Sequence, residues 1–594
     1  MKAPSSWEAT KGFLWIDGLY APFWASRELR QGRLVRVKDE KEKVDVFVTL
    51  LRVCAKNKDL HKGATLHDQI LRRGLLTDCL DALVTMYVQC GELSKAEDLF
   101  AAYKSRDIFT WTALIGGYAQ KGQGEQALTC FEHMLHEGIF PDAVTFNCVL
   151  KACGSIRAVD KGERIHDDIS KQGLLQKNVL LGNSLVNMYA KCGALARAEQ
   201  VLEELPVRNA ISWSSLISGY AEHGEGEQAL DCYERMRHEG LLPDAVTFIC
   251  LLKACGSIRA GEKGELIRDE IAKQGLVGTD IVLNNALVDM YVNCGALDKA
   301  RQLLEELPMR DVVSWSTIIS GYAQQGEGEQ ALKCLEQMER EGLHPNAVTF
   351  ICILKACGSL GAACKGETFH DVISKQGLLG NDIVLSNALI SMYAKCGALP
   401  KAARLLEGLP SRDVISWNAM MAGYIQKGEG EHAIACYEKM QSEGLSPDAT
   451  TFLCVLTACS RLGFVEIAQR NFWKMIVVYG VKPGLEHYTC MVNLFGRVGH
   501  LQDAVEIIKR LPYSDSAVWS SLLGACQKWG DVSVGKWGFD RAIQVDKDDA
   551  APYTLMASIY AAVGMQDDAG HIEAMRIKNK AWAKPQQPCW IEVF

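Results

Sequence analysis

The sequence has few of the features that mark a membrane protein, a disulfide scaffold or a metal enzyme. No run of 18 or more apolar residues occurs, so no segment is predicted to span a membrane as a helix. None of the 22 cysteines forms a C-x-x-C pair, which argues against a zinc ribbon or disulfide scaffold and favours a reducing compartment. Positive charge is also in deficit, with a formal net charge of −8. Nucleic-acid binding would therefore have to rest on local lysines and base-specific contacts.

Enzymatic motifs are equally scarce. The phosphate-binding pattern G-x-x-x-x-G-K-[ST] is absent. A zinc-dependent base deaminase needs H-x-E followed by C-x-x-C, because His and Cys hold the zinc while the Glu transfers protons. His223-Gly-Glu225 and His571-Ile-Glu573 match only the first half of that pattern. We therefore predict no catalytic residues, no metal site and no cofactor.

The most informative feature that is present is a repeat of 102 residues. Residues 312–413 form one unit, made of three segments of 35, 36 and 31 residues. Self-similarity at a fixed period indicates an array of small units that bury their apolar faces against one another. The same interval of 102 separates five tryptophans: Trp111, Trp213, Trp315, Trp417 and Trp519.

Each segment is predicted to fold as two helices. In residues 312–346, apolar residues recur at spacings of three, four and seven, which places them on one helical face, and glycines at 326 and 328 then break the helix. The apolar faces of such a hairpin can be covered only by neighbouring hairpins. The predicted fold is therefore an all-α solenoid with a long concave surface. The buried faces of the two helices would carry Trp315, Ile318, Ile319 and Tyr322, then Ala331, Leu332, Leu335 and Met338.

Several residue types that often carry function recur at repeat positions and are predicted to be structural. Sixteen of the 22 cysteines occupy four repeat positions, in the apolar stripe or at a helix end, where cysteine behaves as a small hydrophobe. The recurring tryptophans lie on the apolar face and are predicted to pack in the core rather than to stack on bases. Three histidines at equivalent positions are interpreted in the same way: His67, His166 and His370.

The repeat also divides the chain. Residues 1–43 lie outside it and mix tryptophans with a basic tract, so they are a candidate organelle transit segment, although acidic residues weaken that match. Residues 44–516 form the array, which starts part-way through a unit. Residues 517–594 are predicted to contain two further hairpins that cap the array, and they end at KPQQPCWIEVF.

The segment VVSWSTIISGYAQQGEGEQALKCLEQMEREGLHPN, with its longer and shorter companions, resembles the pentatricopeptide-repeat proteins of plant organelles. The fixed order of three lengths is similar to the subclass with alternating P (35), L (36) and S (31) motifs. The resemblance implies a right-handed superhelix of helical hairpins. Residues 517–594 resemble the E1 and E2 motifs of that subclass. PCWIEV resembles the junction after which many relatives continue into a DYW-type deaminase, a domain that we expect to be missing here.

The resemblance further implies recognition of single-stranded RNA, one base per motif, with the strand parallel to the chain. In the family, the fifth residue of a motif acts with its last residue, and hydroxyl, amide and carboxylate groups present different hydrogen-bonding patterns to different bases. The second residue sandwiches the bases, as expected here for Ile211, Val313, Val384 and Ile415. The implied pairs are Thr112 with Asp142, Ser214 with Asp244, Ser316 with Asn346 and Asn418 with Asp448 in the P motifs, and Asn183 with Asn209, Asn285 with Asp311 and Asn387 with Asp413 in the S motifs.

The family's code translates these pairs into G, G, A and U for the P motifs and C or U, U and U for the S motifs. Most L motifs are expected to act as spacers, because an aliphatic fifth residue cannot hydrogen-bond. The alternative is that the polar residues only cap helices, since Pro-Asp and Pro-Asn are common before a helix. The L-motif fifth residues are Asn147, Ile249, Ile351 and Leu453.

The resulting functional hypothesis is an RNA-binding adaptor without catalysis of its own. It would recognise sites of C-to-U RNA editing in a mitochondrion or chloroplast, with the mitochondrion slightly favoured, and would recruit a deaminase or editing cofactor protein through residues 517–594. The alternatives are a factor for RNA stability or splicing, and a protein-interaction scaffold of the tetratricopeptide type. Against the scaffold stand the three motif lengths and the lack of basic clamps for a peptide carboxylate.

Overall fold

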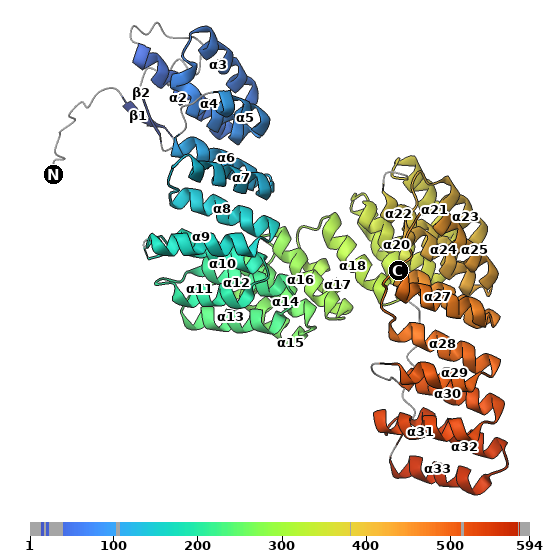
Figure 1. Cartoon of the computed structure of the whole chain (residues 1–594). Helices are drawn as coiled ribbons and strands as arrows, with labels where there is room; N and C mark the ends of the chain where they lie inside the picture. The colour runs from blue at the N-terminus through green and yellow to red at the C-terminus, as the bar shows by residue number, and fades with distance from the viewer. Residues whose placement is uncertain are drawn as a thin grey trace. The chain divides into compact units, whose positions relative to one another are not determined.

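The structure is a computed structural model of the 594-residue chain, and it describes residues 13–16, 19–22, 40–102, 107–176, 178–379, 382–511, 516–579 and 581. The expected transit segment lies mostly outside these residues, as does the PCWIEV segment. The described chain contains 32 helices and one short hairpin of two antiparallel strands, β1 (Phe13–Ile16) and β2 (Leu19–Pro22), which the sequence analysis did not predict. The strands precede the array, which is helical throughout its described part (Figure 1).

The helices alternate between two layers. Even-numbered helices are the first helices of the hairpins: α2 (Glu40–Asn57), α4 (Leu76–Cys90), α6 (Ile108–Gln120), α8 (Ala143–Ile156), α10 (Val179–Lys191), α12 (Ala210–Glu222), α14 (Ala245–Ser257), α16 (Ile281–Asn293), α18 (Val312–Gln324), α20 (Ala347–Leu360), α22 (Ile383–Lys395), α24 (Val414–Gln426), α26 (Ala449–Leu462), α28 (Leu485–Val498), α30 (Ser516–Trp529) and α32 (Ala550–Ala562). Odd-numbered helices are the second helices: α3 (Leu60–Arg72), α5 (Leu93–Ala102), α7 (Gly124–His136), α9 (Val159–Lys171), α11 (Leu195–Glu204), α13 (Gly226–His238), α15 (Gly261–Lys273), α17 (Leu297–Glu306), α19 (Gly328–Arg340), α21 (Ala363–Lys375), α23 (Leu399–Gly408), α25 (Gly430–Ser442), α27 (Val465–Val477), α29 (Leu501–Lys509), α31 (Val532–Val545) and α33 (Gln566–Lys578).

The chain divides into two compact units, Met1–Ala296 and Leu297–Phe594. Within each unit, every even-numbered helix packs against the next even-numbered helix, as α12 does on α14 and α18 on α20. An odd-numbered helix packs on its own partner and on the even-numbered helix that follows, as α13 does on α12 and α14. The predicted stack of helical hairpins is therefore confirmed within each unit, including the hairpins formed by α30 to α33.

Each hairpin is bounded by local signals of the expected kind. Helix α18 begins after Asp311, whose side chain accepts a hydrogen bond from the Ser314 backbone N–H at 2.8 Å. It is followed by Gly326, which has a φ of +81°, a conformation that glycine adopts without strain. Gly328 has a different role from the one that the sequence suggested, because it lies inside α19. A Cβ there would lie 2.7 Å from Leu360 and 3.0 Å from the Ala356 carbonyl oxygen, so glycine allows α19 to approach α20 closely.

Five hairpins, those that begin with α6, α12, α18, α24 and α30, contain the repeated tryptophan in their core. The five recurring tryptophans are between 1% and 4% exposed, which confirms that they pack in the core. The indole N–H groups of Trp213, Trp315 and Trp417 donate to a glutamate at 2.8–3.2 Å, so their polar atoms are satisfied.

Candidate nucleic-acid interface

Apolar side chains lie exposed along the even-numbered helices at the second residue of the motifs. Ten of them are between 52% and 72% exposed, and they follow the motif spacing. Single exposed apolar residues are ordinary on protein surfaces, but a regular series points to a repeated ligand. We call these ten residues the apolar row: Ile211, Val313, Val384 and Ile415, which the sequence analysis named, and Phe109, Val144, Leu180, Val246, Val282 and Val348, which it did not.

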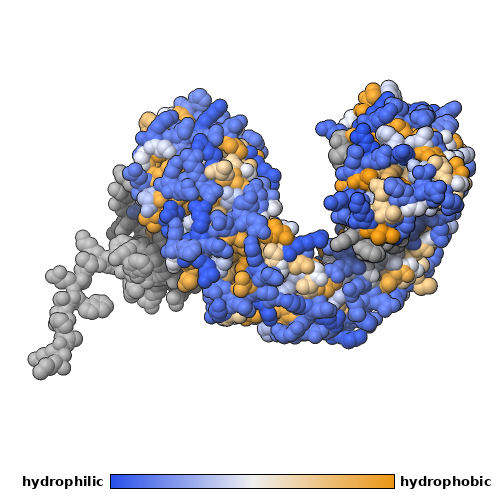
Figure 2. Space-filling view, turned by 90° about the horizontal axis from the view of Figure 1, so that it is seen from below, coloured by the Kyte–Doolittle hydropathy of each residue, from blue (hydrophilic) through white to orange (hydrophobic). Residues whose placement is uncertain are grey.

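Figure 2 shows a surface on which hydrophilic residues predominate and hydrophobic ones are scattered among them. The apolar row could have been completed from the sequence alone, because its members share one motif position. The exposure of these side chains could not have been predicted from the sequence, since the same residue types fill the core a few positions away.

The fifth residue of each P motif hydrogen-bonds with the third residue of the next motif. Ser316 Oγ lies 2.7 Å from Thr349 Oγ1, and the Thr349 hydroxyl also donates to Asn346 Oδ1 at 2.9 Å. The fifth and last residues are thus joined through a shared threonine. The other three P motifs repeat the arrangement: Thr112 with Asp142 through Thr145, Ser214 with Asp244 through Thr247, and Asn418 with Asp448 through Thr451.

The last residue of each paired motif caps the next even-numbered helix. Asp142 Oδ1, for example, accepts from the Thr145 backbone N–H at 2.8 Å. A carboxylate has two oxygens and an amide has both a donor and an acceptor, so a cap made through one atom leaves the other atom for a ligand. Capping and base contact are therefore compatible. All seven last residues make this cap: Asp142, Asn209, Asp244, Asp311, Asn346, Asp413 and Asp448.

The S motifs present their fifth residues differently. Asn387 Nδ2 donates to both carboxylate oxygens of Asp413 at 3.1 Å, whereas Asn387 Oδ1 is buried and has no partner among the described residues. Asn183 is 5% exposed, and neither atom of its amide has a hydrogen-bond partner in the described part of the chain. Asn285 and Asp311 belong to different compact units. Asn183 and Asn387 therefore keep unused hydrogen-bonding capacity beside the apolar row.

The L motifs lack such groups at most fifth positions. Ile249, Ile351 and Leu453 are half-buried aliphatic residues. Asn147 is exposed and accepts a hydrogen bond from the Ser184 hydroxyl. That the L motifs act as spacers stays a prediction.

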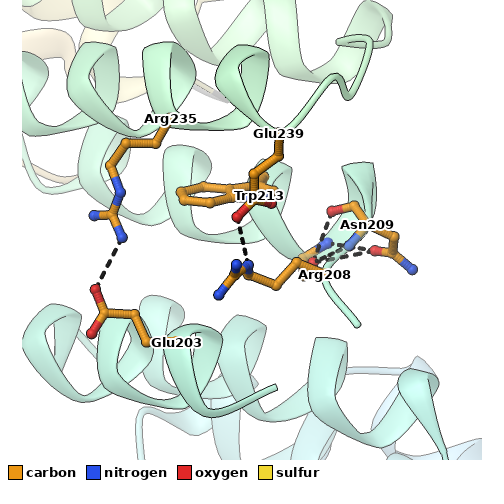
Figure 3. Close-up of polar contacts among 7 residues, drawn as sticks. Glu203, Arg208, Asn209, Trp213, Arg235 and Glu239 are labelled. Carbon is orange, nitrogen blue, oxygen red and sulfur yellow. Dashed lines mark hydrogen bonds and ion pairs between the residues drawn. The ribbon is translucent and has the colours of Figure 1, made fainter. Parts of the chain in front are cut away.

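A repeated ion pair holds the end of an S motif against the next P motif. Arg208 Nε lies 2.7 Å from Glu239 Oε1, and Glu239 also accepts from the Trp213 indole (Figure 3). Arg208 directly precedes Asn209, so the bridge positions the residue that caps α12. The second unit repeats the bridge with Arg310 and Glu341 at 2.9 Å and with Arg412 and Glu443 at 3.0 Å.

Charge is distributed unequally between the two layers. Helices α8, α10, α14, α20 and α22 each contain one lysine and no acidic residue. Odd-numbered helices carry most of the acidic residues and pair many of them across hairpins, as Lys263 does with Glu227 at 2.6 Å. The net negative charge of the chain therefore does not fall on the helices that bear the apolar row.

The cysteines and the recurring histidines, which in other proteins often carry chemistry, have structural surroundings here. The described cysteines are free thiols, and burial raises the pKa of many of them, to about 12 for Cys153 and Cys255. His370 Nδ1 lies 2.9 Å from the Tyr393 hydroxyl, and His67 and His166 make the same contact with a tyrosine.

Among the described residues, no group of three His, Cys, Asp or Glu side chains could hold a metal ion. None of the described helices is long and apolar enough to cross a membrane.

These features define an α-solenoid repeat protein with a periodic polar and apolar interface. The chain belongs to the pentatricopeptide repeat (PPR) family. The PPR repeat family profile matches residues 106–155, 208–257, 310–359 and 412–461. A second profile, PPR repeat, matches residues 45–75, 80–108, 183–209, 285–312, 384–414 and 486–515.

Curated relatives and solved structures agree with this assignment. A chloroplastic pentatricopeptide repeat-containing protein of Arabidopsis thaliana is 31% identical over 92% of this chain and 67% of its own length. A mitochondrial one from the same plant is 32% identical over 92% of this chain and 71% of its own length. Another chloroplastic relative is matched over only 64% of its length. The crystal structure of the pentatricopeptide repeat protein PPR10 from maize shares the fold, with a TM-score of 0.53, 17% identity and coverage of 94% of this chain and 97% of that one.

Proposed function

We propose that this protein binds single-stranded RNA in a sequence-specific manner and acts in RNA processing in an organelle. The observation that carries the proposal is the apolar row, in which ten exposed side chains recur once per motif beside paired polar residues. Unstacked bases can insert between such side chains while their edges meet the polar groups. The chloroplastic and mitochondrial relatives support an organelle as the place of action.

The hydrogen bonds of the fifth residues keep the free-energy cost of base contact low. Ser316 is 6% exposed and bonded to Thr349, so a base that replaces this bond keeps the serine hydroxyl paired. Base contact would stabilise Asn183 more, because a buried polar group without a partner destabilises the protein by about 1–3 kcal/mol. A hydrogen bond from a base edge would remove that destabilisation. The proposed RNA carries, 5′ to 3′, G, any base, C or U, G, any base, U, A, any base, U and U.

The finer proposal is that binding marks a cytidine for C-to-U editing just downstream of the last S motif. Residues 517–594 would then recruit a deaminase in trans. Helices α30 to α33 support this division of labour, because they form hairpins without a member of the apolar row.

A change of two residues tests the reading of bases. The variant Ser316→Asn with Asn346→Asp copies the pair Asn418 and Asp448, in which Asn418 Nδ2 donates to Asp448 Oδ1 at 3.1 Å. We expect the preference at that register to change from A to U, by roughly tenfold if one base-specific hydrogen bond of about 1.4 kcal/mol is exchanged. A gel-shift panel of four RNAs that differ only at this base measures it. An unchanged preference, with binding retained, would remove the proposed reading mechanism.

A further inference from the structure

Three basic residues occupy a backbone conformation that side chains rarely adopt. Lys58, Arg157 and Arg259 have φ angles of +53°, +55° and +54°, and they are the only non-glycine residues with positive φ in the described part of the chain. Each follows the first helix of an L-type motif, at the fifteenth residue counted from residues 44, 143 and 245. Such left-handed backbone is strained for any residue with a Cβ.

The turn at this position does not itself require a side chain. In the last two L motifs, Gly361 and Gly463 occupy the same place with φ of +66° and +77°. The backbone hydrogen bond that closes the turn is also the same: the next residue donates to a cysteine carbonyl at 3.0 Å after Arg157 and at 2.9 Å after both Arg259 and Gly361. A basic side chain at the strained position therefore adds a cost without improving the turn.

The three basic side chains have no structural partner that explains them. Lys58, Arg157 and Arg259 are exposed, and none makes a side-chain hydrogen bond or ion pair with a described residue. Other cations at the ends of even-numbered helices behave differently, since Arg497 donates to the Ser460 carbonyl and Lys528 donates to the Arg497 carbonyl, both at 3.1 Å. Those two cations cap carbonyl groups in the last turns of α26 and α28, whereas the three strained residues remain available to a ligand.

Each of the two arginines acts electrostatically on a cysteine at the end of a helix that bears a member of the apolar row. Burial raises the pKa of the Cys192 thiol at the C-terminal end of α10, and the positive charge of Arg157 opposes that shift. Arg259 acts in the same way on Cys294 at the end of α16. Lys191 lies at the same end of α10, with its side chain close to Gly154 of α8. The ends of α8, α10 and α14 therefore each carry a basic residue: Arg157, Lys191 and Arg259.

We propose that Lys58, Arg157 and Arg259 bind phosphate groups of the RNA strand, an inference that rests on the proposed function. Arg157 is ten residues beyond the fifth residue of its motif, about 15 Å along a helix. A nucleotide and an extended arginine side chain together span that separation. The side chains recur three motifs apart, so they contact one phosphate in every three and carry no base preference.

The test measures how RNA affinity depends on salt for the full chain. The probe is a fluorescein-labelled single-stranded RNA that carries A-A-G-A-C-G-A-U-A-A-U-U, whose first two nucleotides extend over the motifs of residues 44–107, titrated by anisotropy between about 50 and 200 mM KCl. The variant Lys58→Gly with Arg157→Gly and Arg259→Gly should have a weaker salt dependence. The magnitude of its slope of log affinity against log salt should be smaller by about 2, because each phosphate contact on a single strand contributes about 0.7. Its melting temperature should rise, because glycine relieves the strain.

Two matched variants complete the experiment. Gly361→Arg should increase the magnitude of the slope by about 0.7 and lower the melting temperature. The variant Arg157→Lys with Arg259→Lys should keep the wild-type slope. An unchanged slope in the triple glycine variant overturns the proposed phosphate contacts. A lower melting temperature with an unchanged slope would assign the three cations to stabilising helix ends. If the wild-type chain fails to bind the probe or any variant base sequence, the proposed function itself fails, which is a distinguishable result.

Discussion

At the scale of single residues, the last residue of a motif has two functions that the structure makes compatible. Asn346 caps α20 through Oδ1, which accepts from the Thr349 backbone N–H at 2.9 Å. Aspartate caps helices as well as asparagine does, so a change from Asn to Asp alters the groups offered to a base with little effect on the helix. Base preference can therefore vary from motif to motif while the fold stays the same.

The lowered pKa values of the repeated histidines predict how the stability of the chain depends on pH. Burial lowers the pKa of His67, His166 and His370 from the ordinary value of 6.5. A folded-state pKa below the unfolded value means that protonation favours the unfolded chain, so stability is complete above pH 6.5 and falls as the pH decreases below it. We expect the melting temperature to drop between pH 7.5 and pH 5.5, and to drop less in His166→Gln with His370→Gln.

The exposed residue His344 provides the control. His344→Gln should leave the pH dependence of the melting temperature unchanged. Equal pH dependence in wild type and in the double variant would show that the histidines paired with tyrosine are not the groups that titrate.

At the scale of the helical hairpin, close approach between neighbours decides where glycine is required. Gly226 opens α13, and a Cβ there would lie 2.8 Å from the Ala254 carbonyl oxygen on α14 and 2.7 Å from Ile258, the residue that follows α14. Gly124 and Gly328 meet the next even-numbered helix in the same way. Gly524, inside α30, has nothing within 4 Å of its Cβ position.

A pair of alanine substitutions separates these two situations. Gly226→Ala should destabilise the chain by about 1–3 kcal/mol, because a methyl group is forced against a backbone oxygen. Gly524→Ala should stabilise it by about 0.5–1 kcal/mol, since alanine favours a helix and meets no neighbour. Urea denaturation followed by circular dichroism measures both. Destabilisation of similar size in the two variants would contradict the close-approach argument.

At the scale of the whole molecule, the array and the last two hairpins have different expected roles. The apolar row runs from Phe109 to Ile415, whereas α30 to α33 pack on one another and on α28. Because each hairpin in a repeat array contacts only its neighbours, removal of the last hairpins leaves the earlier ones paired as before.

Truncation after residue 516 should therefore spare RNA binding and abolish function in the organelle. Affinity for the proposed RNA should stay within about threefold of the full chain, or roughly 0.6 kcal/mol, while complementation of an organelle that lacks the protein should fail. Circular dichroism of the truncated chain serves as the folding control, and neither form should produce uridine from the RNA with added zinc. Complementation by the truncated chain would contradict recruitment through residues 517–594, and uridine in the purified mixture would contradict the expected lack of catalysis.

The sequence by itself determined the helical hairpins, their register and their core, because a period of 3.6 residues, capping residues and a repeat of fixed length are local signals. It therefore placed Trp315 in the core. Tertiary structure alone decided that Thr349 joins Ser316 to Asn346, that Gly226 faces a carbonyl oxygen, and that the Asn183 amide has no hydrogen-bond partner among the described residues. These contacts depend on how closely one hairpin approaches the next, and that distance is set by packing between side chains that are far apart in the chain.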